Sequence, residues 1–219
     1  MAGINLLVHV KLLFIAMLLF GCATTAAVEL KPTIDNLPTI SKIPLSVRTY
    51  YSRELRSYMY ESVHMYASVH WLPLCQGIVL PLGQASVTLF ERLFPIIFHS
   101  AVTLEAPPAI LPGKEQPSII IEPDIEEVQC ARSAQAKHVE ITYHFSLYTP
   151  GGEALGYWNV TGRGEAKDGF FEDPNTTAGR AADLAMEDAA RKIAIEFKDI
   201  PAVRRLLQEP TPQSDPKQT

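Results

Sequence analysis

The strongest constraint on this chain is a ten-residue segment, residues 138–147, in which apolar and polar side chains alternate without a break. Its apolar members are Val139, Ile141, Tyr143, Phe145 and Leu147. Successive side chains of a β-strand point to opposite faces of a sheet, so this pattern predicts a strand with one face on a core and the other toward water. Such a strand needs a second layer of structure to cover its apolar face.

Neighbouring segments predict more strands around this one. Residues 150–153, Pro-Gly-Gly-Glu, have the composition of a turn, and residues 155–163 form the return strand of a hairpin, with Trp158 and Val160 on one face. Residues 118–125 predict another strand, and Pro123 indicates a strand end or edge, because proline cannot donate to the ladder. Residues 45–52 and 101–105 are predicted as two further strands.

Two segments have the periodicity of helices. Residues 178–198 follow cap residues at 175–177 and place alanines and larger apolar residues at three- and four-residue steps. An alanine-lined face lets a helix lie close on a sheet. Residues 85–94, ending near Pro95, have a broader apolar side. The order of elements predicts an α+β fold, with one mainly antiparallel sheet and two helices packed on one face.

The first twenty-two residues have the layout of an export sequence. An apolar run at 12–20 follows Lys11 and is short for a membrane span. Leu19-Phe20-Gly21-Cys22 resembles the lipobox of bacterial lipoproteins, although the position of Phe20 usually holds a small residue. The resemblance implies that residues 1–21 are a signal peptide and that Cys22 receives a lipid. The alternative is an uncleaved helix with an incidental cysteine.

The rest of the chain divides into three parts. Residues 22–42 are predicted to be a lipidated N-terminus and flexible linker, residues 43–207 a single periplasmic α+β domain, and residues 208–219 a disordered tail. The residue after Cys22 is not the aspartate that retains lipoproteins in the inner membrane in the enterobacterial pattern, which favours the outer membrane. The formal net charge of −5, without a dense basic run, argues against nucleic acid as a partner.

The order and spacing of these elements resemble small outer-membrane lipoproteins of the YajG type. The matching features are Leu82-Gly83 before a helix, the apolar strand that ends at Asp124, the hairpin, and the alanine-rich helix after Thr177. They cover about residues 75–200. The resemblance implies an outer-membrane lipoprotein and brings no catalytic residues with it. The tyrosine-rich segment from Tyr50 to Trp71 has no counterpart, and it is either a contact surface or ordinary core.

Two cysteines remain once Cys22 is lipidated. In an oxidising periplasm, Cys75 and Cys130 are expected to form a disulfide, with two separate buried thiols as the alternative. His138 and His144 share a strand face, but six residues of strand separate them by about 20 Å, which is too far for one metal ion.

Other polar groups do not form a recognisable site. The acidic cluster Asp124, Glu126 and Glu127 is typical of an exposed strand end, and Gly162-Arg163-Gly164 lacks the context of a phosphate loop. We therefore expect no catalytic residues, no cofactor and no metal.

The leading hypothesis is a membrane-anchored, non-enzymatic envelope lipoprotein that binds another envelope protein as an accessory or assembly factor. The alternative is a carrier or sensor of an apolar ligand such as lipid, held between sheet and helices. Its predicted cavity would be lined by Leu89, Phe90, Phe94, Phe145 and Trp158. A hydrolase acting on cell wall or lipid is the least favoured alternative.

Overall fold

The computed structural model describes residues 28–66, 74–106, 118–133, 135–167, 169 and 174–208. The five strands of the main sheet lie in the order β4 (Phe98–Leu104), β1 (Ile43–Tyr50), β5 (Ile119–Arg132), β6 (Ala136–Tyr148) and β7 (Ala154–Lys167). Strands β2 (Tyr60–Tyr66) and β3 (Leu74–Leu80) form a separate antiparallel ribbon. The helices are α2 (Arg53–Arg56), α3 (Leu82–Ile97), α4 (Pro174–Glu196) and α5 (Pro201–Gln208), with a 3-10 turn at Phe197–Asp199.

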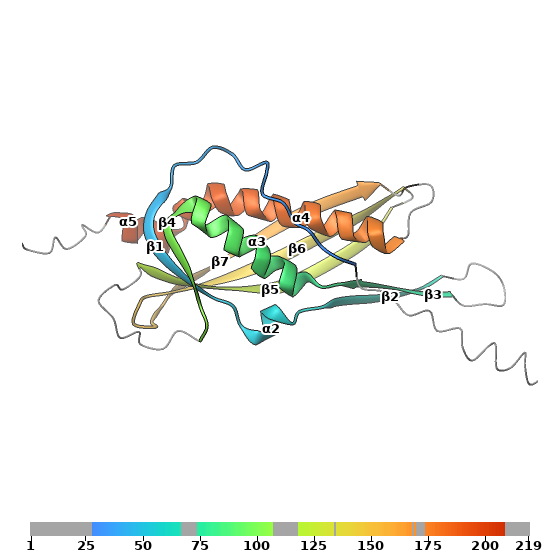
Figure 1. The fold of residues 1–219 in the computed structure, drawn as a ribbon, viewed down its shortest axis with the longest axis horizontal. Coiled ribbons are helices and arrows are strands. Elements are labelled where there is room, and N and C mark those ends of the chain that lie inside the picture. Colours follow the sequence, from blue (N-terminus) through green and yellow to red (C-terminus); the bar gives the residue numbers. More distant parts are fainter. Residues whose placement is uncertain are drawn as a thin grey trace, which may run out of the picture.

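These elements make two layers (Figure 1): α3 and α4 lie on the same face of the sheet, and the β2–β3 ribbon projects beyond one end of the body. The predicted α+β class is confirmed. The prediction of a mainly antiparallel sheet with two helices is corrected, because the sheet is mixed and four α-helices are described. Strand β1 runs parallel to both β4 and β5, whereas β5, β6 and β7 pair antiparallel. Alternation within a strand shows which face a residue occupies, but it carries no information about the direction of the neighbouring strand.

Strand β6 forms the centre of the core. All five apolar residues predicted for its inner face are at most 1% exposed, and the polar residues between them are half-exposed. Tyr143 is fully buried, and its hydroxyl is hydrogen-bonded to the hydroxyl of Ser86 in α3 (3.0 Å). The strand predicted from alternation is therefore confirmed. Its apolar face points toward the helices, and its polar face points away from them.

Pro123 lies inside β5 and not at its end. Strand β1 pairs with β5 only at Ile119–Ile121, so the edge of β5 on that side has no partner in the main sheet from the next residue onward. The missing N–H of Pro123 therefore breaks no ladder there. The strand continues to Arg132, with a bulge between Ile125 and Glu127.

Helix α4 lies on β7 at backbone distance. A Cβ atom added at Gly162 would stand 2.0 Å from the carbonyl oxygen of Ala185, and one at Gly164 would stand 2.0 Å from that of Ala181. The sequence predicted an alanine-lined helix face, and the structure adds that glycines occupy the facing positions of the strand. The Gly-Arg-Gly segment thus serves helix packing.

Residues 28–42, which the sequence analysis assigns to the linker, lie across α3 and α4, and we call them the N-terminal strap (Figure 1). The backbone N–H of Lys31 donates to Asp183 Oδ1 (2.9 Å), and the Thr33 hydroxyl donates to Glu187. Five partly buried apolar side chains of the strap pack against the core: Val28, Leu30, Ile34, Leu37 and Ile40. Polar and apolar contacts together fix the strap on the helices.

Candidate functional site: the open face of the sheet

The face of β5, β6 and β7 that points away from the helices collects most of the polar residues singled out in the sequence. We call it the open face. By register it comprises Glu122, Asp124, Glu127 and Gln129 of β5, alternate residues of β6 from His138 to Tyr148, and alternate residues of β7 from Tyr157 to Glu165. None of these side chains is buried, and Tyr157 is 73% exposed. The open face is therefore a surface available to solvent and to partners.

Directly opposed residues of β6 and β7 are hydrogen-bonded or ion-paired in succession along this face. Arg163 donates twice to the carboxylate of Glu140, at 2.8 and 3.0 Å. The hydroxyls of Thr142 and Thr161 are 3.0 Å apart, and His138 Nδ1 lies 3.6 Å from Glu165 Oε2. Opposed side chains of an antiparallel pair are close enough to stabilise each other, so this ladder holds the polar face in one arrangement.

The next pair up the ladder extends to β5. His144 Nδ1 donates to Asn159 Oδ1 (2.7 Å), and Asn159 Nδ2 donates to Glu126 Oε2 (2.6 Å). The ring of His144 also stacks on that of Tyr157, with centroids 5.5 Å apart. Glu126 reaches this network because the bulge in β5 leaves two consecutive residues, Glu126 and Glu127, exposed.

The open face is strongly acidic. Its carboxylates, with that of the bulge residue, are Glu122, Asp124, Glu126, Glu127, Glu140 and Glu165. Arg163 is the basic residue among the face residues of β7 from Tyr157 to Glu165 and is already paired with Glu140, and Lys167 continues the same side of β7 at its end. The hydrogen bond from Arg163 lowers the pKa of Glu140, so this carboxyl is ionised at neutral pH. The remaining carboxylates give the face an excess of negative charge.

A shallow hollow of about 350 Å³ lies at one end of this face. It is lined by Gln129, Ala131, Val139, Gly164 and the two ion pairs His138–Glu165 and Glu140–Arg163. In each of these pairs the two side chains are bonded to one another. No three His, Cys, Asp or Glu side chains gather into a possible metal site within the described ranges. The arrangement can recognise charge and hydrogen-bonding groups.

The acidic cluster predicted at the end of a strand is dispersed. Asp124 accepts a hydrogen bond from the backbone of Ile125 (2.8 Å), Glu127 from Gln129 (2.9 Å), and Glu126 from Asn159. The three carboxylates do not converge on one point.

The predicted cysteine sites are only partly described. Cys22 lies outside the described residues, as does the side chain of Cys75, whose backbone pairs with Met65 in the ribbon. Cys130 is half-buried on β5, and burial raises the pKa of its thiol. Lipidation and the disulfide therefore stay predictions.

The aromatic residues named for an apolar cavity are in contact with one another. Ring centroids are 5.6 Å apart for Phe90 and Phe94, 5.5 Å for Phe90 and Phe145, and 5.5 Å for Phe145 and Trp158. Such distances are those of packed aromatic pairs. The rings thus fill the space between sheet and helices. Of the tyrosine-rich segment, Tyr51 is core at 2% exposure.

A second hollow, of about 440 Å³, lies between the N-terminal strap and α3. It is lined by Glu29, Leu30, Lys31, Pro32 and Thr33 of the strap and by Pro81, Gln84, Ala85, Thr88 and Arg92. Arg92 closes one side by donating to the carbonyl of Pro32 (3.2 Å). Sequence analysis missed this region, because the apolar residues of the strap follow neither the helical nor the strand period.

No protein-family model matches this chain, and no curated protein matches its sequence. Within the described residues, no helix is both long and apolar enough to cross a membrane. Several solved structures are similar in shape. A Xanthomonas campestris protein of the DUF330 family aligns with a TM-score of 0.47 and 9% identity, over 78% of this chain and 93% of its own.

Two others are similar at a greater distance. A minor lipoprotein of Acinetobacter baumannii aligns with a TM-score of 0.40 and 7% identity, over 75% of this chain and 96% of its own. A candidate lipoprotein of Caulobacter crescentus aligns with a TM-score of 0.39 and 11% identity, over 58% of this chain and 84% of its own. These are distant likenesses of shape.

Proposed function

We propose that this chain is a lipid-anchored protein of the bacterial envelope that has no enzymatic activity and binds a basic segment of another envelope protein through its open face. The observation that carries the binding part is the acidic, exposed ladder on β5, β6 and β7. The lipobox at residues 19–22 supports the anchor. We also propose that the membrane is the outer membrane and that the protein is related to YajG-type lipoproteins.

The anchor follows from the chemistry of an acylated cysteine. Each buried CH₂ of an acyl chain contributes about 0.8 kcal/mol, and several chains on Cys22 would hold the protein on a membrane stably. A single substitution tests this. We expect Cys22→Ser to abolish palmitate labelling and to leave an unprocessed precursor of higher mass. Unchanged labelling and unchanged membrane fractionation would refute the anchor.

The open face is suited to a charged partner. Complementary charge raises the rate of encounter and fixes the register of a complex. The side chains of the ladder are already held by one another, so binding orders few of them anew and loses little conformational entropy. Tyr157, stacked on His144 and mostly exposed, adds an aromatic contact of the kind that is frequent at interaction hot spots.

Charge reversal tests the proposed surface. The double variant Glu126→Lys and Glu165→Lys changes the middle and one end of the open face, and Glu196→Lys is the control because Glu196 is exposed on α4. After crosslinking in intact cells, we expect the wild type and the control to capture the same envelope protein and the double variant to lose it. Equal capture by all three would contradict binding through the open face. Urea unfolding of each variant shows that the fold is retained.

The apolar-ligand alternative rests on the hollow between the strap and α3. It predicts that gently purified protein carries a lipid detectable by mass spectrometry. The variant Ala85→Glu, in the lining of that hollow, should then release the lipid. Its presence in wild type and its loss in this variant would favour the carrier over the protein-binding function.

A further inference from the structure

The chain between the lipidation site and the N-terminal strap is short. Only five residues separate Cys22 from Val28, so the six intervening Cα–Cα steps span at most about 21 Å. Val28 is fixed on the domain: its N–H donates to the carbonyl of Val79 in β3 (3.4 Å), and its side chain lies against Gly179 of α4. A lipid on Cys22 would therefore hold the membrane surface within that distance of Val28. This step rests on the proposed lipid anchor.

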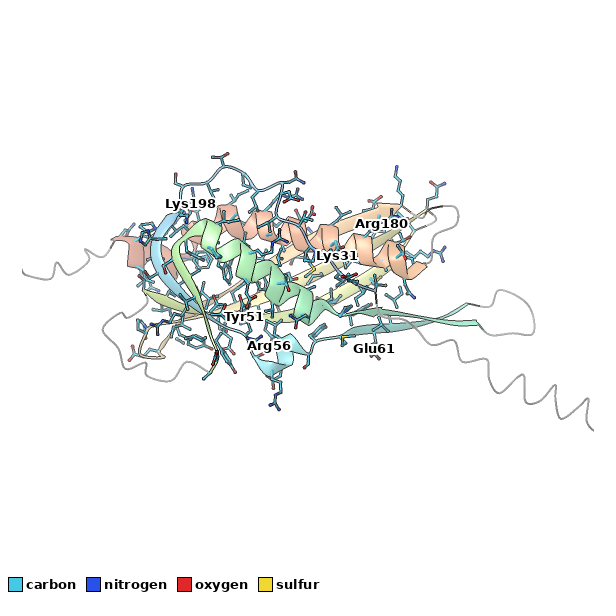
Figure 2. The ribbon with its side chains drawn as sticks, in the orientation of Figure 1. Lys31, Tyr51, Arg56, Glu61, Arg180 and Lys198 are labelled. Carbon is cyan, nitrogen blue, oxygen red and sulfur yellow. The ribbon has the colours of Figure 1, made fainter. Side chains whose placement is uncertain are left out.

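Val28 lies at the base of the β2–β3 ribbon. The ribbon continues outward from Val79, which pairs with Glu61, to the last pair, Leu74 with Tyr66. The five residue-to-residue steps of strand from Val79 to Leu74 cover about 17 Å. Figure 2 places Glu61 where the ribbon leaves the body. The ribbon and the tether thus start at the same place and have nearly the same reach.

The sequence of this region has no Asp, Glu, Lys or Arg between Glu61 and Glu91. A charged side chain resists transfer into a bilayer, so the part of the ribbon beyond Glu61, which has none of these four residue types, is compatible with membrane contact. Tyr60, Tyr66 and Trp71 belong to the residue types that gather at the level of lipid headgroups. In the described residues, the outer half of the ribbon pairs only strand to strand, so one edge of each strand there has no sheet partner, and such backbone groups exclude it from the hydrocarbon centre.

We propose that the outer half of the β2–β3 ribbon, at residues 63–66 and 74–77, is a second membrane contact that lies in the interface of the same bilayer that holds the lipid of Cys22. The lipid and the ribbon together fix the orientation of the domain. The end of the body that carries Val28 and the base of the ribbon faces the membrane.

Photo-crosslinking of the full chain in intact cells tests this inference. p-Benzoylphenylalanine, which inserts into nearby C–H bonds, replaces Tyr66 in one variant and Val102 in the other. Val102 is 56% exposed on β4, at the far end of the body from the ribbon (Figure 1). After irradiation, mass spectrometry of the mature protein reports lipid adducts at the probe and acyl chains on Cys22 separately.

We expect a phospholipid adduct at position 66, none at position 102, and acyl chains on Cys22 in both variants. An acylated protein whose position 66 forms adducts only with proteins, or forms none, overturns the membrane contact and leaves the proposed function standing. A mature protein without acyl chains on Cys22 refutes both the anchor and the membrane contact inferred from the short tether.

Discussion

Replacing Gly162 with alanine should test whether α4 lies on β7 at backbone distance. The new Cβ would stand 2.0 Å from the carbonyl oxygen of Ala185 and 2.8 Å from Cβ of Ala189. Non-bonded heavy atoms prefer about 3.5–4.0 Å, so strand and helix must separate by more than about 1 Å. The helix cannot tilt freely, because Gly164 holds it equally close two residues further along the strand.

The expected cost follows from this clash. Overpacking a core costs about 1–3 kcal/mol, and a clash with backbone belongs at the upper end because no side chain can rotate away. We therefore expect Gly162→Ala to lose about 3 kcal/mol, a large part of the 5–15 kcal/mol typical of a domain. Urea titration followed by circular dichroism measures the loss.

The matched control is the same substitution at Gly151. Its added Cβ meets nothing nearer than the Thr149 hydroxyl, at 3.7 Å. Both substitutions reduce the entropy of the unfolded chain equally, an effect of about 0.4–1 kcal/mol in favour of folding. Gly151→Ala should therefore be neutral or slightly stabilising. If the two variants unfold at the same urea concentration, α4 and β7 are not in close contact.

Three further predictions concern the core, the strap and the cysteines. In urea titration, Phe145→Ala should lower the free energy of unfolding by about 3–5 kcal/mol, whereas His144→Ala should change it by no more than about 0.5 kcal/mol. Equal losses in the two variants would contradict a strand buried on one face only. Burial raises the pKa of Asp183 to about 6, so its contribution favours folding at acid pH and is lost as the pH rises through that value. Asp183→Asn, which keeps an acceptor for the strap, should match the wild type near pH 4 and exceed it above pH 7 by about 1–2 kcal/mol, after allowance for solvent screening of a half-buried carboxylate; an unchanged difference across this range would contradict the assignment. Non-reducing peptide mapping decides the disulfide expected from the sequence: a Cys75–Cys130 peptide would tie the outer ribbon to β5 and contradict the membrane contact, whereas free alkylation of both thiols without reductant would exclude the bridge.

The sequence was most informative where one segment carried a complete local pattern. The alternation of residues 138–147 predicted β6 and its two faces, and the alanines of residues 178–198 predicted the helix that lies on it. Both patterns are local, because each side chain's direction follows from the period of its own element. The helix at residues 85–94 was also found, but α3 extends to Ile97. Pro95 falls in its last turn, where it removes a single backbone donor and does not end the helix.

What the sequence could not supply depends on partners distant in the chain. The parallel pairing of β1 with β4 and β5 joins segments whose own patterns say nothing about direction. The N-terminal strap has no helical or strand period, and its apolar residues pack against a core built from distant parts of the chain. Its polar anchors, Asp183 and Glu187, lie about 150 residues away from it. The ribbon was missed for a related reason, since its pattern does not alternate cleanly.

The open face shows the same division. That His138, Glu140 and His144 share a polar face follows from strand geometry alone. Their partners on β7 follow only from the register of the hairpin. Glu126 joins the hydrogen-bond network of the open face because a bulge shifts the alternation of β5 by one residue. No residue type in this segment predicts the bulge.

The close packing of α4 on β7 also bears on how a partner can bind. The outer edge of β7 is covered by polar side chains of that helix: Lys192 donates to the carbonyl of Thr161 (2.6 Å), Asp188 accepts from the N–H of Arg163 (3.0 Å), and Arg180 donates to the carbonyl of Lys167 (2.9 Å). An exposed edge strand is a template for pairing with another chain, and these bonds occupy it. A partner that added a strand at β7 would have to displace three hydrogen bonds, all of them to charged side chains of a helix held by the glycine contacts. Recognition at this side of the sheet is therefore left to the side chains of the open face, which is why reversing their charge, and not altering the edge, is the informative perturbation.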